Sequence, residues 1–438
     1  MFRPPALPPP MVILKTSPSH ASPCPGVDLY TLPDSRFKRA ILEVHFDRAL
    51  ADGFSPARFL LGRVLEQGTQ SHPSRMELTR EEEGLWGGCV ALDGDRLADA
   101  HRMTLSCSWV GAEFLPEGEV AESGILALGQ ELMSKPLPDS SGSPFQATSF
   151  QRERSQLALR IRTLKDDKAA WARERYLQCL CEGESYGTPP WESEEKVLSL
   201  TPEEVDTARL SLVKRAPVTA IAVGPIQADS IAPWLQSWLG GSERDSTPIN
   251  EATPIPSELR EVHEQMPMDQ ARFLMGFRFP ELSSSEDLEA LSLATSLLGG
   301  GTHSRLFRVV REEKSLCYGI SAGTRLKKGI LTVGAGIDAQ AYEEVRDEVL
   351  RQVQVLVHGD YSNQELEDAR AGLLHDLDTI GDSATGLSRY SAREVMLGMH
   401  RSPAERAEKI QSLDKDSVSN MASQWNASLV YLLEGGQG

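Results

Sequence analysis

LLGGGTHSRLF, residues 297–307, is the stretch that decides how this chain is interpreted, and REEKSLCY, residues 311–318, follows it after three residues. The first part ends an apolar helical pattern in three consecutive glycines. Glycine has no side chain, so such a run can both end a helix and let another backbone approach closely. Gly299, Gly300 and Gly301 therefore predict either a helix C-cap with a tight turn or a loop that touches an extended peptide.

The second part of the stretch holds an arginine and a tyrosine seven positions apart. Arg311 offers a guanidinium that can bind two acceptors at once, and Tyr318 offers a phenol donor. Such groups can hold a substrate carbonyl and stabilise a developing oxyanion. Taken alone, the pair would instead be a surface arginine in the charged run 311–314 and a half-buried tyrosine of a strand.

An internal duplication is visible in the chain. Residues 80–88, REEEGLWGG, match residues 311–319, REEKSLCYG, at the arginine, both glutamates, the leucine and the last glycine. The elements predicted around each copy agree in type and order. They are strands 40–46 and 271–279, helices 59–65 and 288–298, strands 103–110 and 330–337, helices 121–133 and 342–357, and closing strands 218–223 and 429–433. Gly87 stands where the second copy has Tyr318, so the tyrosine belongs to the second half alone.

Two homologous α+β halves joined by a linker account for this pattern. Residues 240–258 are rich in glycine, serine, threonine, aspartate and proline, which marks a linker. Residues 1–26 begin with five prolines in the first ten and are predicted to be a Pro-rich tail. The predicted domains are therefore 27–239 and 259–438.

Helix starts are also marked in the sequence. Thr201 with Glu204, and Ser362 with Glu365, each have the spacing of a capping box, in which the two side chains satisfy two backbone N–H groups.

Taken in order, the glycines, S-R-L-F, R-E-x-K and L-x-Y resemble the C-terminal domain of insulinase/pitrilysin-type zinc peptidases, the family that includes the mitochondrial processing peptidase. The resemblance covers about residues 27–435 and extends to zinc-less bacterial members. It implies an α+β fold of two homologous insulinase-family (LuxS/MPP-like) domains, each a mainly antiparallel sheet with helices packed on it. It also implies a catalytic role for Arg311 and Tyr318 opposite the zinc, and substrate binding by Gly299, Gly300 and Gly301.

The zinc motif of the family, H-x-x-E-H, is missing, because none of the nine histidines begins it. Counting back from the Gly-Thr pair at 68–69, the resemblance places two ligand positions on Phe59 and Arg63 and the catalytic glutamate on Gly62. The third ligand position falls on Arg160. A phenyl ring or a guanidinium offers no lone pair to zinc, and without metal there is no activated water. We therefore expect this chain to bind no zinc or other cofactor by itself.

Two functions remain open. The first is the R/Y-bearing subunit of a heterodimeric peptidase, in which a homologous H-x-x-E-H subunit brings the zinc. In the family, short peptides bind as an added strand. The second is a non-catalytic scaffold that binds a peptide or protein in a modification pathway. A neighbouring reading frame that encodes an H-x-x-E-H homologue would favour the first.

The composition restricts partners and location. Lys and Arg total 45 and Asp and Glu total 63, a formal charge of -18, which disfavours nucleic-acid or anionic-membrane partners. No apolar run approaches the ~20 residues needed to span a bilayer. The six cysteines form no C-x-x-C pair, which indicates buried thiols in a reducing, cytoplasmic setting.

Two other groups have a functional and a structural interpretation. His303 could touch a peptide or cap the glycine turn, and Asp166, Asp167 and Lys168 could form an acid–base cluster or a solvated turn between helices. The structural interpretation is favoured in both cases.

Overall fold

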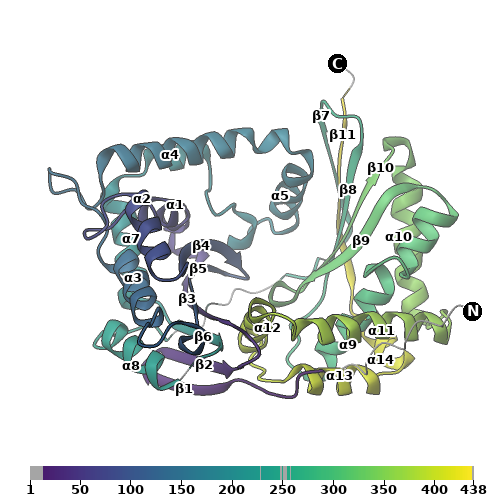
Figure 1. Cartoon of the computed structure of the whole chain (residues 1–438). Coiled ribbons are helices and arrows are strands. Elements are labelled where there is room, and N and C mark those ends of the chain that lie inside the picture. Colours follow the sequence, from purple (N-terminus) through teal and green to yellow (C-terminus); the bar gives the residue numbers. More distant parts are fainter. Residues whose placement is uncertain (1–12, 227, 247–248, 250–253, 257, 437–438) are drawn as a thin grey trace, which may run out of the picture.

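The fold is that of a computed structural model, which describes residues 13–226, 228–246, 249, 254–256 and 258–436. Two α+β domains lie side by side, each built on one sheet (Figure 1). Antiparallel pairs predominate in both sheets, which confirms the predicted fold class. The predicted linker, 240–258, stays a prediction, and its residues 247–248, 250–253 and 257 lie outside the described part.

The first domain contains the following strands and helices. The strands are β1 (Ser19–Cys24), β2 (Val27–Pro33), β3 (Arg39–Ala49), β4 (Cys89–Leu97), β5 (Ala100–Val110) and β6 (Val218–Gly224). The helices are α1 (Ser55–Leu65), α2 (Arg75–Gly84), α3 (Glu122–Ser134), α4 (Ala147–Arg162), α5 (Lys168–Leu180), α6 (Glu194–Ser199), α7 (Pro202–Arg215) and α8 (Ala228–Leu239).

The second domain repeats this plan. Its strands are β7 (Arg260–Met266), β8 (Ala271–Arg278), β9 (Cys317–Arg325), β10 (Ile330–Ile337) and β11 (Asn426–Gly435). Its helices are α9 (Ser285–Gly299), the π-helix η5 (Phe307–Glu313), α10 (Tyr342–His358), α11 (Asn363–Ile380), α12 (Ala384–Met396), α13 (Pro403–Ser412) and α14 (Lys415–Ala422).

The two sheets share one topology. Their strand orders are β1-β2-β6-β3-β5-β4 and β7-β11-β8-β10-β9. Without β1, the orders correspond strand for strand, and in each sheet the first pair is parallel while the following pairs are antiparallel. The duplication read from the sequence is therefore present in three dimensions.

The predicted end of the N-terminal tail is wrong. Residues 19–24 form β1, which pairs with β2 along its backbone, so the first domain begins before residue 27. The side chains of β1 are mostly exposed, and a strand without a buried face has no alternating apolar pattern to mark it. Residues 1–12 of the predicted tail lie outside the described part.

Local capping fixes several helix starts as predicted. Thr201 with Glu204 and Ser362 with Glu365 both form the capping box. Asp167 accepts the N–H groups of Ala169 and Ala170 at the start of α5. The segment 166–168 is thus the turn between two helices that the sequence favoured.

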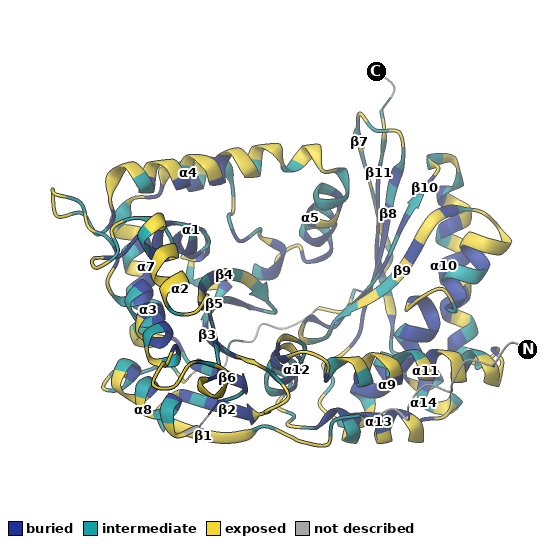
Figure 2. Ribbon diagram, viewed as in Figure 1, coloured by how far each residue is buried: buried dark blue, intermediate teal, exposed yellow. Residues whose placement is uncertain are grey.

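Each sheet has helices of both domains on it. On one face, α1, α3 and α7 cover the first sheet, and α9, α10 and α14 cover the second. On the other face, α12 of the second domain packs on β2 and β6, and α5 of the first domain packs on β8 and β11. The central strands are accordingly mostly buried (Figure 2).

Four buried charges join the domains. Glu184 lies between Lys328 and Arg278. The Oε2 atom of Glu184 is 2.7 Å from Lys328 Nζ, and its Oε1 atom contacts the guanidinium of Arg278. Lys328 also contacts Asp99, and Arg278 donates to the carbonyl of Leu180 at 3.1 Å. Two acids of the first domain therefore meet two bases of the second, which balances the charge.

Within the described residues, none of the helices has the length and apolar character needed to cross a membrane.

Candidate functional site

Tyr318 lies at the start of β9 in a bulge that turns it outward. The pairing with β10 passes from Gly319 opposite Gly336 to Cys317 opposite Ile337, so Tyr318 is the extra residue. A bulge can aim a side chain away from the core, and the Tyr318 side chain is indeed 77% exposed, whereas Cys317 is buried. The alternative interpretation, a half-buried tyrosine in a strand, is wrong. It assumes that side chains along the strand alternate regularly between the two faces of the sheet, and the bulge interrupts that alternation.

Arg311 is tied to the same strand end. Its Nε donates to the main-chain carbonyl of Tyr318 at 3.1 Å, and its guanidinium carbon lies 4.4 Å from the centre of the Phe307 ring. The pair predicted from the sequence is therefore brought together, with Arg311 holding the backbone that carries the tyrosine. Both side chains remain exposed to solvent.

The three glycines form the end of α9. The N–H of Gly300 donates to the Ser296 carbonyl at 2.9 Å, which is a helix C-cap. A Cβ at Gly299 would lie 2.6 Å from the backbone nitrogen of Ala322, so α9 packs closely against β9 only because this residue is glycine. The helix-cap interpretation thus describes their geometry, and their contact with a peptide stays a prediction.

His303 lies between the glycine turn and α11. A Cβ at Gly301 would lie 3.2 Å from its ring, and a Cβ at Gly372 would lie 3.3 Å from it. The half-buried ring therefore fills a packing position between these two segments.

β9 forms the outer edge of the second sheet, and that edge is open. The strand pairs with β10 on one side only. Along the described part of the chain, the only side-chain hydrogen bond to its backbone is the one that Arg311 makes to Tyr318. An unpaired strand edge of this kind can accept an extended peptide as a further strand.

The corresponding edge of the first sheet, β4, is closed by carboxylates. Alternate N–H groups of this strand point outward, and each donates to a carboxylate oxygen 2.7 to 3.0 Å away: Val90 to Glu82, Leu92 to Glu66, Gly94 to Asp93 and Arg96 to Asp95. These N–H groups are not free for another strand. The two halves therefore differ in the edge that they offer.

The positions aligned with the zinc site line one cavity of about 590 Å³. Phe59, Gly62 and Arg63 project from α1 and Arg160 from α4, so the structure brings all four together. The Phe59 ring lies 5.5 Å from that of Trp191, centre to centre. Within the described residues no group of three or more His, Cys, Asp or Glu side chains could hold a metal ion, and at the four aligned positions neither a phenyl ring, a glycine nor a guanidinium can bind zinc.

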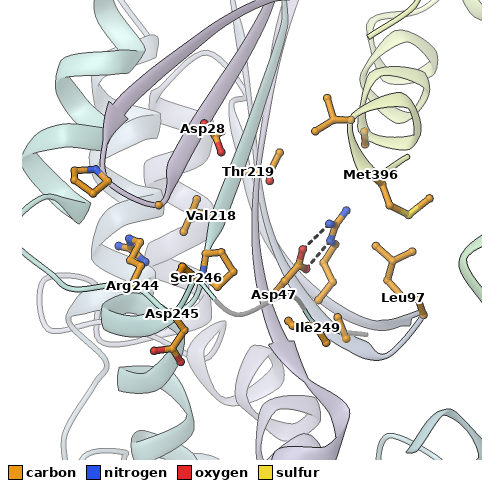
Figure 3. A pocket seen from close by; sticks show the side chains of 18 of the residues that line it. Asp28, Asp47, Leu97, Val218, Thr219, Arg244, Asp245, Ser246, Ile249 and Met396 are labelled. Atoms are coloured by element: carbon orange, nitrogen blue, oxygen red, sulfur yellow. Dashed lines mark hydrogen bonds and ion pairs between the residues drawn. The ribbon is translucent and has the colours of Figure 1, made fainter. Parts of the chain in front are cut away.

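A further cavity of about 590 Å³ lies beside the segment that leaves the first domain (Figure 3). Arg102 donates to both carboxylate oxygens of Asp47, at 2.7 and 2.6 Å. Asp245 accepts from Arg48 and Arg215. These charges satisfy each other, and none of the residues predicted for a site lies here.

Two features could not be recognised in the sequence. The carboxylates that close β4 are one, although Asp93 and Asp95 alternate along the strand and could have drawn attention. The other is a groove of about 730 Å³ on the second sheet, opposite its own helices, which includes Gly319, Gly323 and three arginines. The arginines come from α5, β8 and β9, and only the fold brings them together.

Comparison with known proteins agrees with this geometry. Residues 199–373 match the family described as "Peptidase M16 inactive domain". A Bacillus subtilis protein named "Probable inactive metalloprotease YmfF" is 24% identical over 416 residues, 94% of this chain and 97% of that protein.

Two solved structures share the fold. A conserved protein from Enterococcus faecalis superposes with a TM-score of 0.87 at 20% identity, covering 97% of this chain and all of the other. A peptidase M16 inactive domain from Pseudomonas fluorescens has a TM-score of 0.79 at 17% identity, covering 96% of this chain and 99% of the other. Residues 199–373 are therefore similar to the inactive M16 peptidase domain, and the positions of this chain that align with the family's zinc site hold residues that cannot bind zinc.

Proposed function

We propose that this chain is the peptide-binding, non-zinc subunit of an M16-type peptidase pair. A homologous H-x-x-E-H chain supplies zinc, water and general base, and this chain supplies Tyr318 and Arg311 from the opposite wall. The observation that carries the proposal is the bulge at Tyr318, which presents an exposed phenol at the head of an open strand edge.

The peptide pairs with β9 as an added strand. β9 offers free backbone groups, whereas the N–H groups of β4 are occupied by carboxylates. Main-chain hydrogen bonds supply affinity without requiring a particular sequence. A peptide bound there runs past Tyr318, because the tyrosine begins the strand.

The phenol of Tyr318 stabilises the oxyanion that forms when the partner's water attacks the peptide carbonyl. The hydrogen bond from an O–H donor that is already in position becomes stronger as negative charge develops on the carbonyl oxygen. Arg311 positions the tyrosine through its hydrogen bond to the Tyr318 carbonyl and its stacking on Phe307.

Reconstitution with the H-x-x-E-H homologue encoded in the same genome tests the proposal. The pair should form a one-to-one complex that buries more than about 1,000 Å² and cleaves short peptides. Tyr318→Phe should leave the complex and the partner's zinc intact and lower kcat by about 100- to 1,000-fold. Cleavage at the wild-type rate by the Tyr318→Phe complex would overturn the proposal.

A scaffold without any catalytic contribution is the second candidate. The observation that favours it is that Arg311 Nε already donates to the carbonyl of Tyr318 and its guanidinium already stacks on the Phe307 ring. In that case the chain binds peptides at β9 with wild-type affinity in the Tyr318→Phe variant and activates no partner.

All six cysteines are free thiols, which fits the cytoplasmic location that we propose.

A further inference from the structure

The groove on the second sheet carries charge of one sign. Of the described residues that line it, three are charged, and all are arginines: Arg173 of α5, Arg272 of β8 and Arg325 of β9. No carboxylate is among the described residues that line this groove. The formal charge of the whole chain is -18. A groove whose charged residues are all positive is therefore the opposite of what the composition predicts.

The acids that attract the three guanidinium groups lie beyond ion-pair distance: Asp167 acts on Arg173 and Arg272, and Asp95 and Glu174 act on Arg325. Within the described residues none of them forms an ion pair, and the nearest groups that receive their hydrogen bonds are neutral. Arg272 donates to the Gln270 side chain at 2.8 Å and its Nε is buried without a partner, while Arg325 interacts with the hydroxyl of Tyr186. Arginines elsewhere in this chain are mostly paired, as Arg96 is with Glu174.

The cationic surface continues into an adjoining cavity of about 470 Å³, which shares Thr324 and Arg325 with the groove. Lys327 adds a further cation there. The other bases of this cavity already have carboxylate partners: Arg96 with Glu174, Lys328 with Asp99 and Glu184, and Arg393 with Glu394. Its one acid, Asp95, accepts the N–H of Arg96 at 2.7 Å.

Small residues form the floor of the groove. Gly319 and Gly323 of β9 have open space where a side chain would stand, and Gly334 and Gly336 of β10 lie beside them. The floor is therefore low enough for a second backbone to lie close to the sheet. The groove extends over β8 and β10 beside α5 and reaches β9, the edge strand where an added strand would bind.

We propose that this groove selects acidic peptides, namely extended segments whose alternate side chains are aspartate or glutamate. This inference rests on the proposed peptide binding at β9. Side chains two positions apart on a strand lie on the same face, and Arg272 is level with Gly319 while Arg325 lies six residues further along β9, so a peptide with several alternate carboxylates can place different ones at the two arginines. A guanidinium fork binds a carboxylate through two parallel hydrogen bonds.

A peptide fits this groove better than a nucleic acid does. Single-stranded nucleic acids need exposed aromatic faces on which bases stack. The one aromatic residue among those that line the groove, Phe273, is fully buried. Free backbone donors and acceptors on a strand edge match another peptide backbone.

Calorimetric titration of the full-length chain tests the selection. The probes are two N-acetylated decapeptides of one sequence, with glutamate at alternate positions in one and glutamine in the other. The glutamate peptide should bind about 10-fold or more tightly. The difference should shrink as salt rises from about 50 to about 500 mM, because salt screens charges that are partly exposed.

Arg272→Gln and Arg325→Gln should each reduce the preference for the glutamate peptide about 10-fold, and Arg272→Lys should retain part of it. Arg80→Gln is the matched control. Arg80 is an exposed arginine of α2 with no ion pair in the described part of the chain, and its replacement should change nothing. Thermal unfolding shows that each variant is folded.

Three outcomes would overturn the inference. Equal binding of both peptides disproves acid selection and leaves peptide binding at β9 standing. Binding of neither peptide removes the proposed function as well. Tighter binding of an oligothymidine decamer, lost in Arg272→Gln and Arg325→Gln, assigns the groove to nucleic acid.

Discussion

Lys328 Nζ lies 2.7 Å from Asp99 Oδ1, and this ion pair joins residues 229 positions apart, both almost fully buried at the junction of the two domains. A buried charge is tolerated only when it is paired, because its removal from water costs several kcal/mol. The relative placement of the domains therefore depends on this contact and on its neighbour Glu184.

Lys328→Met should destabilise the protein by about 3 to 5 kcal/mol, because it leaves Asp99 and Glu184 buried with only Arg278 to compensate them. Urea unfolding followed by circular dichroism measures the loss. The control, Arg162→Gln, breaks the exposed ion pair with Glu194 and should leave the midpoint unchanged. A wild-type midpoint for Lys328→Met would contradict the role given to the cluster.

Gly299→Ala should destabilise the second domain by about 1 to 3 kcal/mol, because the new methyl group would lie 2.6 Å from the Ala322 nitrogen and 2.7 Å from its Cβ. Gly323→Ala is the control, since nothing lies within 4 Å of the added atom. Thermal melts of the two variants should differ clearly. Equal melting temperatures would show that α9 and β9 can move apart without cost.

Stability should fall as the pH is lowered from about 6.5, because burial lowers the pKa of His45 and of His101 to about 3. Below about pH 6.5 these two histidines bind protons in the unfolded chain but stay neutral in the folded chain, so protonation favours unfolding. Each histidine contributes about 1.4 kcal/mol per pH unit down to its folded pKa. Denaturant titrations at several pH values give the slope.

His101→Gln should remove about half of that slope between pH 6 and pH 5, where most carboxylates remain ionised. The exposed His375→Gln should keep the wild-type slope. A pH-independent stability of the wild-type protein in this range would contradict the burial argument.

Purified protein should contain no stoichiometric zinc. Phe59 and Arg63 offer no lone pair at the positions that the family uses for ligands, and Gly62 offers no base. Elemental analysis after dialysis against zinc checks this. Near-equimolar zinc held with high affinity would mean that the metal has another site on the chain.

Arg311→Lys should impair the reconstituted pair about as much as Arg311→Ala does. Lysine keeps the charge but loses both the Nε donor to Tyr318 and the planar face that stacks on Phe307. We expect kcat to fall about 10-fold or more, with a rise in KM. Full activity of Arg311→Lys would mean that only the charge matters.

Local features of this protein could be predicted from its sequence. β10 spans residues 330–337 as expected, and the capping box at Thr201 forms. Apolar alternation and capping are set by neighbours in the chain, so the printed order of residues contains them. The duplicated segment also revealed the repeated topology, because each copy carries its own set of flanking elements.

Features made by distant residues could not be predicted. The bulge at Tyr318 depends on the register with β10, and the pair of Lys328 with Asp99 depends on how the domains meet. The cationic groove collects Arg173, Arg272 and Arg325 from three elements. Neither the spacing of residues nor the composition shows that residues from distant elements meet. The negative net charge of the chain would even predict that a cationic groove is absent.

The exchange of helices between the domains affects how the chain folds as it is made. The first sheet is complete once residue 224 has been synthesised, yet the part of its face that carries Tyr30 and Ile221 packs against α12, which begins at residue 384, and against Ile380 of α11. Domains usually fold in order of synthesis. Here the first half leaves the ribosome with an apolar surface exposed and completes its core only when the second half is nearly finished.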